Sequence, residues 1–257
     1  MRLLLGLLIL SLSFLPVSAA PARVAYAMAT GVHGAAATTS PIDTTGASLL
    51  WIGLGNGNTG STSVSDSKGN TWHTTTIYNR NGSTLFTMLY SYDHGGSSLS
   101  VGAGHTVTVT GWDPGFAFVA YSGTLTSGDP YDQHNGANAG DNNIYTGSIT
   151  PSANGALVLV GYNVWNATTT AIDSSFVLVD AIVNSSSSGN TGFAQLVQIT
   201  AVPINAHLTL SWYRDAAVMI ASFKPAAASH PTGNPIILMI TPALFDWFRS
   251  ITPWPAR

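Results

Sequence analysis

Apolar and polar residues alternate along most of the chain, and this pattern predicts β-strands joined by short turns. In residues 105–122 an alternating segment, a Trp-Asp-Pro-Gly turn and an apolar segment predict a hairpin. A second stretch of this kind covers residues 207–223, where the leading histidine and the turn aspartate recur 102 positions later. No convincing helical stripe interrupts these segments, so we expect about twelve short strands and an all-β fold.

The order of the elements repeats in the two halves of the chain. A Gly-Ala pair near an apolar strand, an Asp-Ser turn and the His-led stretch occur in the first half and recur in the same order in the second. We therefore predict an antiparallel, jelly-roll-like β-sandwich built from two duplicated half-units, whose strands interleave in shared sheets. Within the first half, Asn81-Gly82 separates two β-prone segments and predicts a tight hairpin turn.

A targeting segment precedes this body. Residues 1–19 hold one basic residue, Arg2, then an apolar run, then small residues before the expected cleavage site, as a secretory signal peptide does. An uncleaved membrane anchor is the alternative, but the apolar run is shorter than the ~20 residues that span a bilayer. We expect a secreted protein, extracellular or periplasmic, with its β-sandwich domain in residues 20–225.

Residues 226–257 form a linker and an apolar tail whose composition differs from that of the body. Within the tail, Ile236–Ile251 predicts an apolar run followed by a short helix. This segment is too short and too charged to span a membrane comfortably, so we expect no transmembrane span in the mature chain. Three readings stay open: the tail packs on its own domain, joins a partner or another subunit in an oligomer, or lies in a membrane interface.

Composition excludes several classes of function. Asp, Glu, Lys and Arg make up only 7% of the 257 residues, every acidic residue is Asp, and the formal net charge is −3. Such a chain lacks the basic footprint of a nucleic-acid-binding protein. The absence of cysteine excludes a disulfide framework, thiol catalysis and Cys-ligated metal sites.

Residues 124–145 connect the two halves and predict a long polar loop. Their amides, carboxylates and tyrosines suit a glycan, through hydrogen bonds and stacking, or calcium, which prefers oxygen ligands. The EF-hand order is absent, so calcium is an alternative rather than a predicted cofactor, and a plain solvated crossover is the third reading. Together with two tryptophans at strand ends, the candidate ligand-binding residues are Asp129, Tyr131, Asp132, His134, Asp141, Tyr145, Trp165 and Trp112.

Catalytic signatures are weak. The chain has no Gly-x-Ser-x-Gly elbow. Glycoside hydrolysis needs two carboxyl groups, and the opposing candidates, Asp113 and Asp215, are assigned to turn chemistry. The two strand-leading histidines, His105 and His207, are read as marks of the duplication. We therefore predict no catalytic residue.

Three segments carry a family resemblance. Residues 42–50, the Asp-Ser-Lys-Gly-Asn-Thr-Trp run at 66–72, and the closing Ala-Ser-Phe-Lys at 221–224 are similar to segments of jelly-roll and concanavalin-like sandwiches of secreted and phage-associated bacterial proteins. The resemblance implies the fold and supplies no catalytic residue.

The function expected from these observations is non-catalytic binding of a glycan or a cell-surface partner through loops at one end of the sandwich. One alternative is a structural component of an extracellular or virion assembly, held by the tail. The other is a jelly-roll polysaccharide-degrading enzyme, whose groove would have to contain Arg80 or Arg214.

Overall fold

The computed structural model describes residues 19–227, apart from positions 33, 57–61, 83, 174 and 185–188. The described residues form antiparallel strands and contain no helix, which confirms the all-β prediction. The predicted signal peptide and the tail segment Ile236–Ile251, with its expected helix, lie outside the described residues.

The first half-unit folds as two facing antiparallel sheets. Its large sheet has the order β1-β11-β3-β7-β5, with β6 also on β7, and its small sheet has the order β2-β10-β4. Alternate residues of β3 and β11, such as Ile52 and Phe118, pack against Val107 and Val109 of the small sheet. The strands are β1 (Ala22–Thr30), β2 (Ala37–Thr38), β3 (Leu49–Asn56), β4 (Ser63–Asp66), β5 (His73–Thr74), β6 (Tyr78–Arg80), β7 (Thr84–Ser91), β10 (Val107–Thr110) and β11 (Gly115–Ser122), with a separate hairpin of β8 (Asp93–His94) and β9 (Ser97–Ser98).

The second half-unit forms one sheet in the order β12-β17-β13-β16-β15, with β14 also on β17. Two of its strands are long and bend, so their remote ends fold over the outer face of the sheet. Leu208 of β17 and Ile144 of β12 therefore pack on Val158 and Val160 of β13. The strands are β12 (Tyr131–Ile149), β13 (Ala156–Trp165), β14 (Thr169–Ile172), β15 (Val177–Asn184), β16 (Gly189–Gln198) and β17 (Ile204–Phe223).

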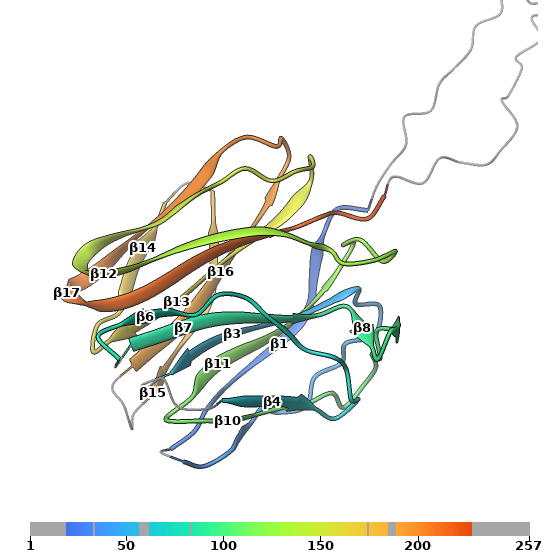
Figure 1. The fold of residues 1–257 in the computed structure, drawn as a ribbon, viewed down its shortest axis with the longest axis horizontal. Coiled ribbons are helices and arrows are strands. Elements are labelled where there is room, and N and C mark those ends of the chain that lie inside the picture. The colour runs from blue at the N-terminus through green and yellow to red at the C-terminus, as the bar shows by residue number, and fades with distance from the viewer. Residues whose placement is uncertain are drawn as a thin grey trace, which may run out of the picture. The chain divides into compact units, whose positions relative to one another are not determined.

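The two half-units repeat the same strand order, as the sequence predicted. The bent strand β12 takes the places of β1 and β2, β17 takes those of β10 and β11, and β13, β14 and β16 match β3, β4 and β7. The predicted interleaving of strands is wrong, since each sheet draws its strands from one half only. Each half-unit already covers the outer face of its large sheet, and the two large sheets then pack face to face (Figure 1).

The predicted His-led hairpins are also wrong. β10 pairs with β2 and β4, whereas β11 pairs with β1 and β3, so this stretch crosses from one sheet to the other. The equivalent stretch of the second half is the single bent strand β17. Alternation predicted the strands but could not show which strands pair. The Asn81-Gly82 hairpin is confirmed: both residues have positive φ, 55° and 72°, between β6 and β7.

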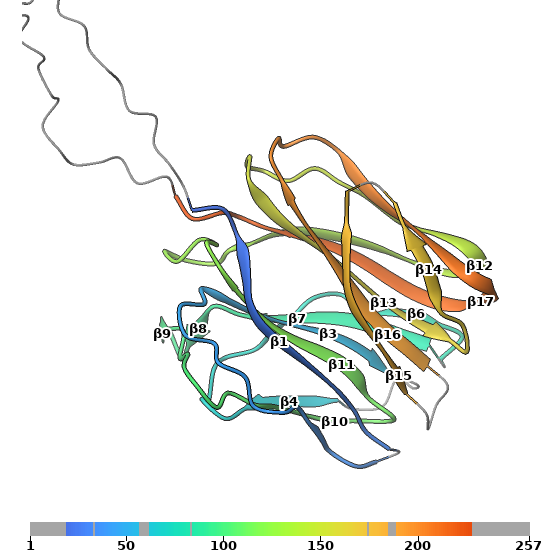
Figure 2. The same ribbon diagram turned by 180° about the vertical axis from the view of Figure 1, so that it is seen from behind.

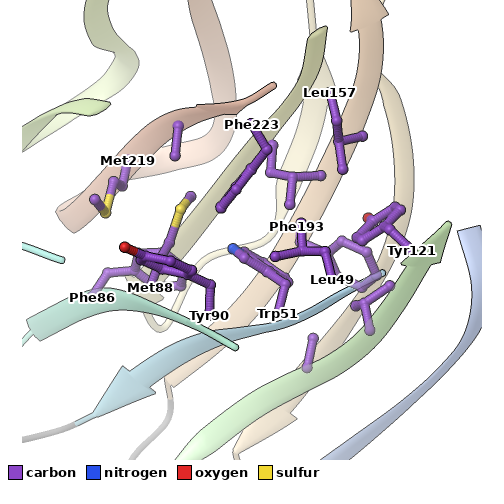
Figure 3. Packing of buried hydrophobic residues seen from close by; sticks show 14 of the residues in the cluster. Leu49, Trp51, Phe86, Met88, Tyr90, Tyr121, Leu157, Phe193, Met219 and Phe223 are labelled. Atoms are coloured by element: carbon purple, nitrogen blue, oxygen red, sulfur yellow. The ribbon is translucent and has the colours of Figure 1, made fainter. Parts of the chain in front are cut away.

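The shared core lies between the two large sheets (Figure 3). β17 contributes Met219, Ala221 and Phe223, and β11 contributes the residues 102 positions earlier. Successive side chains of a strand point to opposite faces of its sheet. The odd-numbered residues of β11 and β17 are the ones that point toward the other large sheet. Trp51, at 0% exposure, tilts against Phe193 with ring centroids 5.4 Å apart.

Close approach of the two half-units at Gly161 gives a first prediction. A Cβ added to Gly161 of β13 would lie 2.2 Å from Cζ of Phe86, which belongs to β7 of the other half-unit. Gly161→Ala is expected to destabilise the protein by about 1–3 kcal/mol through overpacking. Urea denaturation of this variant, Phe86→Leu and the double variant measures the coupling. If the double variant loses the full sum of the single effects, this contact is not the cause.

Candidate functional site

The segment expected to be a linking loop is mostly strand. Residues 131–149 form β12, the edge strand of the second sheet, and pair along its length with β17. The prediction of a loop was wrong because it relied on polar composition. A strand at the edge of a sheet can carry many polar residues. The structure consequently distributes the eight candidate residues over three separate places.

The first place is a stack of aromatic rings that crosses between the half-units. The ring of Tyr90 in β7 stacks on His73 and on Tyr131, with centroids 5.3 Å away in both cases. His73 also stacks on Tyr92 at 5.0 Å, and the Tyr131 hydroxyl bonds to Nδ1 of His134. We call this set the Tyr–His ladder; its members are Tyr78, Tyr90, Tyr92, Tyr131, His73 and His134.

Polar partners hold the edges of the ladder. The Tyr90 hydroxyl donates to Oδ2 of Asp129 at 3.1 Å, and His73 Nε2 lies 3.0 Å from Oδ1 of Asp93. Burial, with the Asp129 carboxylate nearby, raises the pKa of Tyr90, and burial lowers the pKa of His134. Ring faces covered by one another cannot stack on a ligand. The ladder therefore joins the half-units. Asp129, Tyr131 and His134 have structural contacts within it.

Three further candidates have structural partners. Asp132 accepts from Ser152 N–H at 2.8 Å and from the Ser222 hydroxyl at 3.0 Å. Burial acts to raise the pKa of Asp132, but these hydrogen bonds lower it overall. Tyr145, in the outer layer, stacks on His207 with centroids 4.5 Å apart. Asp141 lies at the bend of β12, where its Oδ1 accepts from the next two backbone N–H groups.

Exposed aromatic residues gather at the end of the domain where β12 and β17 bend. We call this region the bend end; it lies on the left in Figure 1 and on the right in Figure 2. Trp165, Trp212 and Tyr213 are 40%, 59% and 63% exposed. The Trp212 indole N–H donates to the Asn166 carbonyl at 3.1 Å, which holds its ring beside the end of β13. Among the described residues none of these three rings stacks on another ring.

Polar groups from both half-units converge beside these rings. Arg80 Nε lies 3.1 Å from Oδ1 of Asp215, and Asn81 Nδ2 donates to Oδ2 at 3.3 Å. A Cβ added to Gly140 would lie 2.7 Å from Arg80 Nη2 and 3.1 Å from the Tyr213 hydroxyl. The glycine therefore leaves room for a charged and a hydroxyl group. Asp215, assigned to a turn from the sequence, instead lies within β17 and pairs across the half-units.

Trp112 belongs to the same end. It is 43% exposed and lies in the bend between β10 and β11, next to Gly111. A Cβ on Gly111 would meet Nδ2 of Asn56 at 3.3 Å, and the Asn56 carbonyl accepts from Nδ2 of Asn163 at 3.1 Å. Trp112 and Trp165 are thus the two sequence-predicted residues that the structure leaves as exposed aromatics at one end. Trp212 and Tyr213 were missed, although the run Trp-Tyr-Arg-Asp breaks the alternation of β17.

A separate polar cluster lies inside the first half-unit. His105 Nε2 is 3.0 Å from Oδ1 of Asp66, and its Nδ1 is 2.9 Å from the Thr44 hydroxyl. The chain of Thr, His and Asp looks like a proton relay, but the His105 and Asp66 side chains are fully buried and Thr44 is too. No substrate can reach it, so the cluster is structural.

The described residues contain neither a cluster of metal-ligating side chains nor a membrane-spanning helix. Within that part of the chain, no group of three or more His or Asp side chains is placed to hold a metal ion. No helix there is long and apolar enough to cross a membrane.

Comparison with protein-family models, with curated proteins and with solved structures gives no match. The fold defines a class, a β-sandwich of two structurally repeated half-units, and the bend end is its candidate binding surface.

Proposed function

We propose that this protein is a secreted, non-catalytic β-sandwich that binds a glycan at the bend end. The observation that carries the proposal is the set of exposed aromatic rings, Trp165, Trp212 and Tyr213, beside fixed polar groups. A cluster of exposed aromatic side chains marks a binding surface more often than scattered single residues do.

Sugars present both kinds of surface that this end offers. Their C–H faces pack on aromatic rings, and their hydroxyl groups donate and accept hydrogen bonds. Arg80 supplies donors and Asp215 supplies acceptors, and their mutual ion pair holds both in place. Because this pair is about one-third exposed, its remaining hydrogen-bonding capacity can reach a ligand.

Two sequence features support the same proposal. The predicted signal peptide would bring the chain to the compartment where extracellular glycans occur. The segments at 42–50, 66–72 and 221–224 resemble those of jelly-roll and concanavalin-like sandwiches from secreted bacterial proteins.

Removal of the exposed rings tests the proposal. Trp165→Ala and Trp212→Ala are each expected to weaken binding on a glycan array by roughly tenfold or more, as truncation of an aromatic anchor does. Their thermal unfolding midpoints should stay close to the wild-type value, because the rings are exposed. Tyr145→Ala, an exposed aromatic in the outer layer, is the matched control and should bind normally. Equal binding by all variants would place the site elsewhere.

A further inference from the structure

The hydrogen-bonding groups at the bend end are unbalanced. Asp215 accepts from Arg80 and Asn81 through its two oxygens, so donors of the protein itself hold this carboxylate. Asp141 accepts from two backbone N–H groups through Oδ1. Both carboxylates are therefore engaged by donors of the protein, and neither forms an ion pair with Arg214.

Donors remain on Arg214. Its Nη1 donates to the Tyr213 carbonyl at 3.2 Å, and within the described residues no hydrogen bond uses its Nη2. Its Nε is buried without a hydrogen-bond partner there, so the Nη groups are the ones that a ligand can reach. Asp141 lies directly across from Arg214 in the β12–β17 register, yet the two do not form an ion pair. The Asp141 carboxylate accepts the neighbouring N–H groups instead, so the Arg214 charge is left without an ion-pair partner in the described part of the chain.

The position of Arg214 links this charge to the aromatic surface. Its Cζ lies 5.8 Å from the ring centroid of Trp212, a cation–π contact. A sugar packed against the exposed part of the Trp212 ring would thus lie close to a guanidinium that can bind a carboxylate or sulfate through parallel hydrogen bonds.

We infer that the bend end recognises acidic polysaccharides, with Arg214 as the residue that binds their anionic groups. This inference rests on the proposed glycan-binding function and adds the chemical class of the ligand. Uronate carboxylates and sulfate esters are both anions that can accept paired hydrogen bonds from the Arg214 guanidinium. The experiment distinguishes these two groups.

The test measures binding of the full chain to two pairs of polymers: polygalacturonate and its methyl ester, and dextran sulfate and dextran. We expect the anionic member of at least one pair to bind more tightly than its neutral partner. Arg214→Gln should reduce that binding by about tenfold or more while leaving the neutral partner unchanged. Arg214→Lys keeps the charge but loses the planar guanidinium. Its affinity for the anionic polymer should therefore lie between that of the wild type and that of Arg214→Gln.

Arg23→Gln is the matched control, because Arg23 lies on β1, over Tyr26, rather than at the bend end. An equal loss in Arg23→Gln and Arg214→Gln would indicate unspecific charge attraction and overturn the inference. If the wild type binds the charged and neutral polymers equally and Trp212→Ala binds neither, the inference of acidic-polysaccharide recognition is overturned. The glycan-binding proposal would still stand. Absence of binding to every polymer and to every glycan on the array would overturn both. Thermal unfolding of each variant confirms that it folds.

Discussion

Replacement of Asp66 by Asn is expected to destabilise the protein by about 3–5 kcal/mol, because it removes a buried carboxylate that accepts hydrogen bonds from several buried donors. Asp66 accepts from His105 Nε2 at 3.0 Å and from the indole N–H of Trp72 at 2.8 Å. The backbone N–H groups of Lys68 and Asn70 also donate to it, at 2.8 and 3.1 Å. Asn offers one oxygen in place of two and adds two hydrogens that face these donors. For a domain of this size the thermal midpoint should fall by roughly 6–20 °C.

The second half-unit supplies the matched control. Asp173 is the structural counterpart of Asp66, but within the described residues its Oδ1 accepts only the backbone N–H of His207, at 2.8 Å. His207 turns its ring toward Tyr145 instead. Asp173→Asn keeps an oxygen acceptor, so its effect should stay within about 1 kcal/mol. Similar losses for both variants would show that burial of the pair is not the cause.

The same comparison has a defined pH dependence. Burial acts to raise the pKa of Asp66, but hydrogen bonds from His105, Lys68 and Trp72 lower it overall. A carboxyl group with a lowered pKa in the folded state stabilises the fold above its unfolded-state value, about 4. That stability is lost as the pH falls through the lower folded-state pKa. The stability gap between wild type and Asp66→Asn should therefore be constant at pH 5–7 and shrink below about pH 4.

The Asp66 network also explains a motif that the sequence could only partly interpret. The Asp-Ser turn predicted at the start of the run at 66–72 is confirmed, and Gly69 has the positive φ of 72° that a turn requires. The sequence could not show that Asp66 accepts a hydrogen bond from the distant His105 while Asn70 and Trp72 donate to the same carboxylate. His105 and His207 hold equivalent positions, and only the first is buried against an aspartate.

The fold was predictable where local patterning decides it. Alternation identified the strands and the repeated order, and Asn81-Gly82 identified a turn that needs two positive φ angles. Pairing between distant strands was not predictable, because the same alternation suits a hairpin and a strand that crosses between sheets. The Asn- and Gly-rich β12 read as a loop, since its strand character depends on β17 and on side-chain bonds such as Asn135 Nδ2 to the Ser148 carbonyl, 3.0 Å.

The candidate site was predictable only in part for a related reason. Tyr131 and His134 have the composition of a binding loop, but their rings are covered by neighbours from the other half-unit. Trp212 and Tyr213 lie in a segment that reads as core, and the bend of β17 exposes them. The exposure of a ring depends on which strand ends lie next to each other in the fold. The pattern of apolar and polar residues along the sequence does not contain that information.

Asn163→Leu is expected to destabilise the protein by about 2–4 kcal/mol, because it removes a buried polar contact between the half-units. Asn163, on β13, is 4% exposed, and its Nδ2 donates to the carbonyls of Asn56 and Leu85, both at 3.1 Å. Those carbonyls end β3 and begin β7 of the other half-unit. Leucine has a similar volume but no donor, so two buried acceptors lose their partner. Urea denaturation measures the loss.

Asn154→Leu provides the same chemical change at an exposed position within one half-unit, where the Asn154 Oδ1 accepts from Ala201 N–H at 2.8 Å. Its cost should be within about 0.5 kcal/mol. A cost for Asn163→Leu no larger than this would mean that the Asn163 hydrogen bonds do not contribute to holding the half-units together. The larger expected cost implies a directional contact near the bend end. Since Asn163 precedes Trp165 by two residues on the same strand face, this contact also fixes the strand that carries one of the proposed ligand-binding rings.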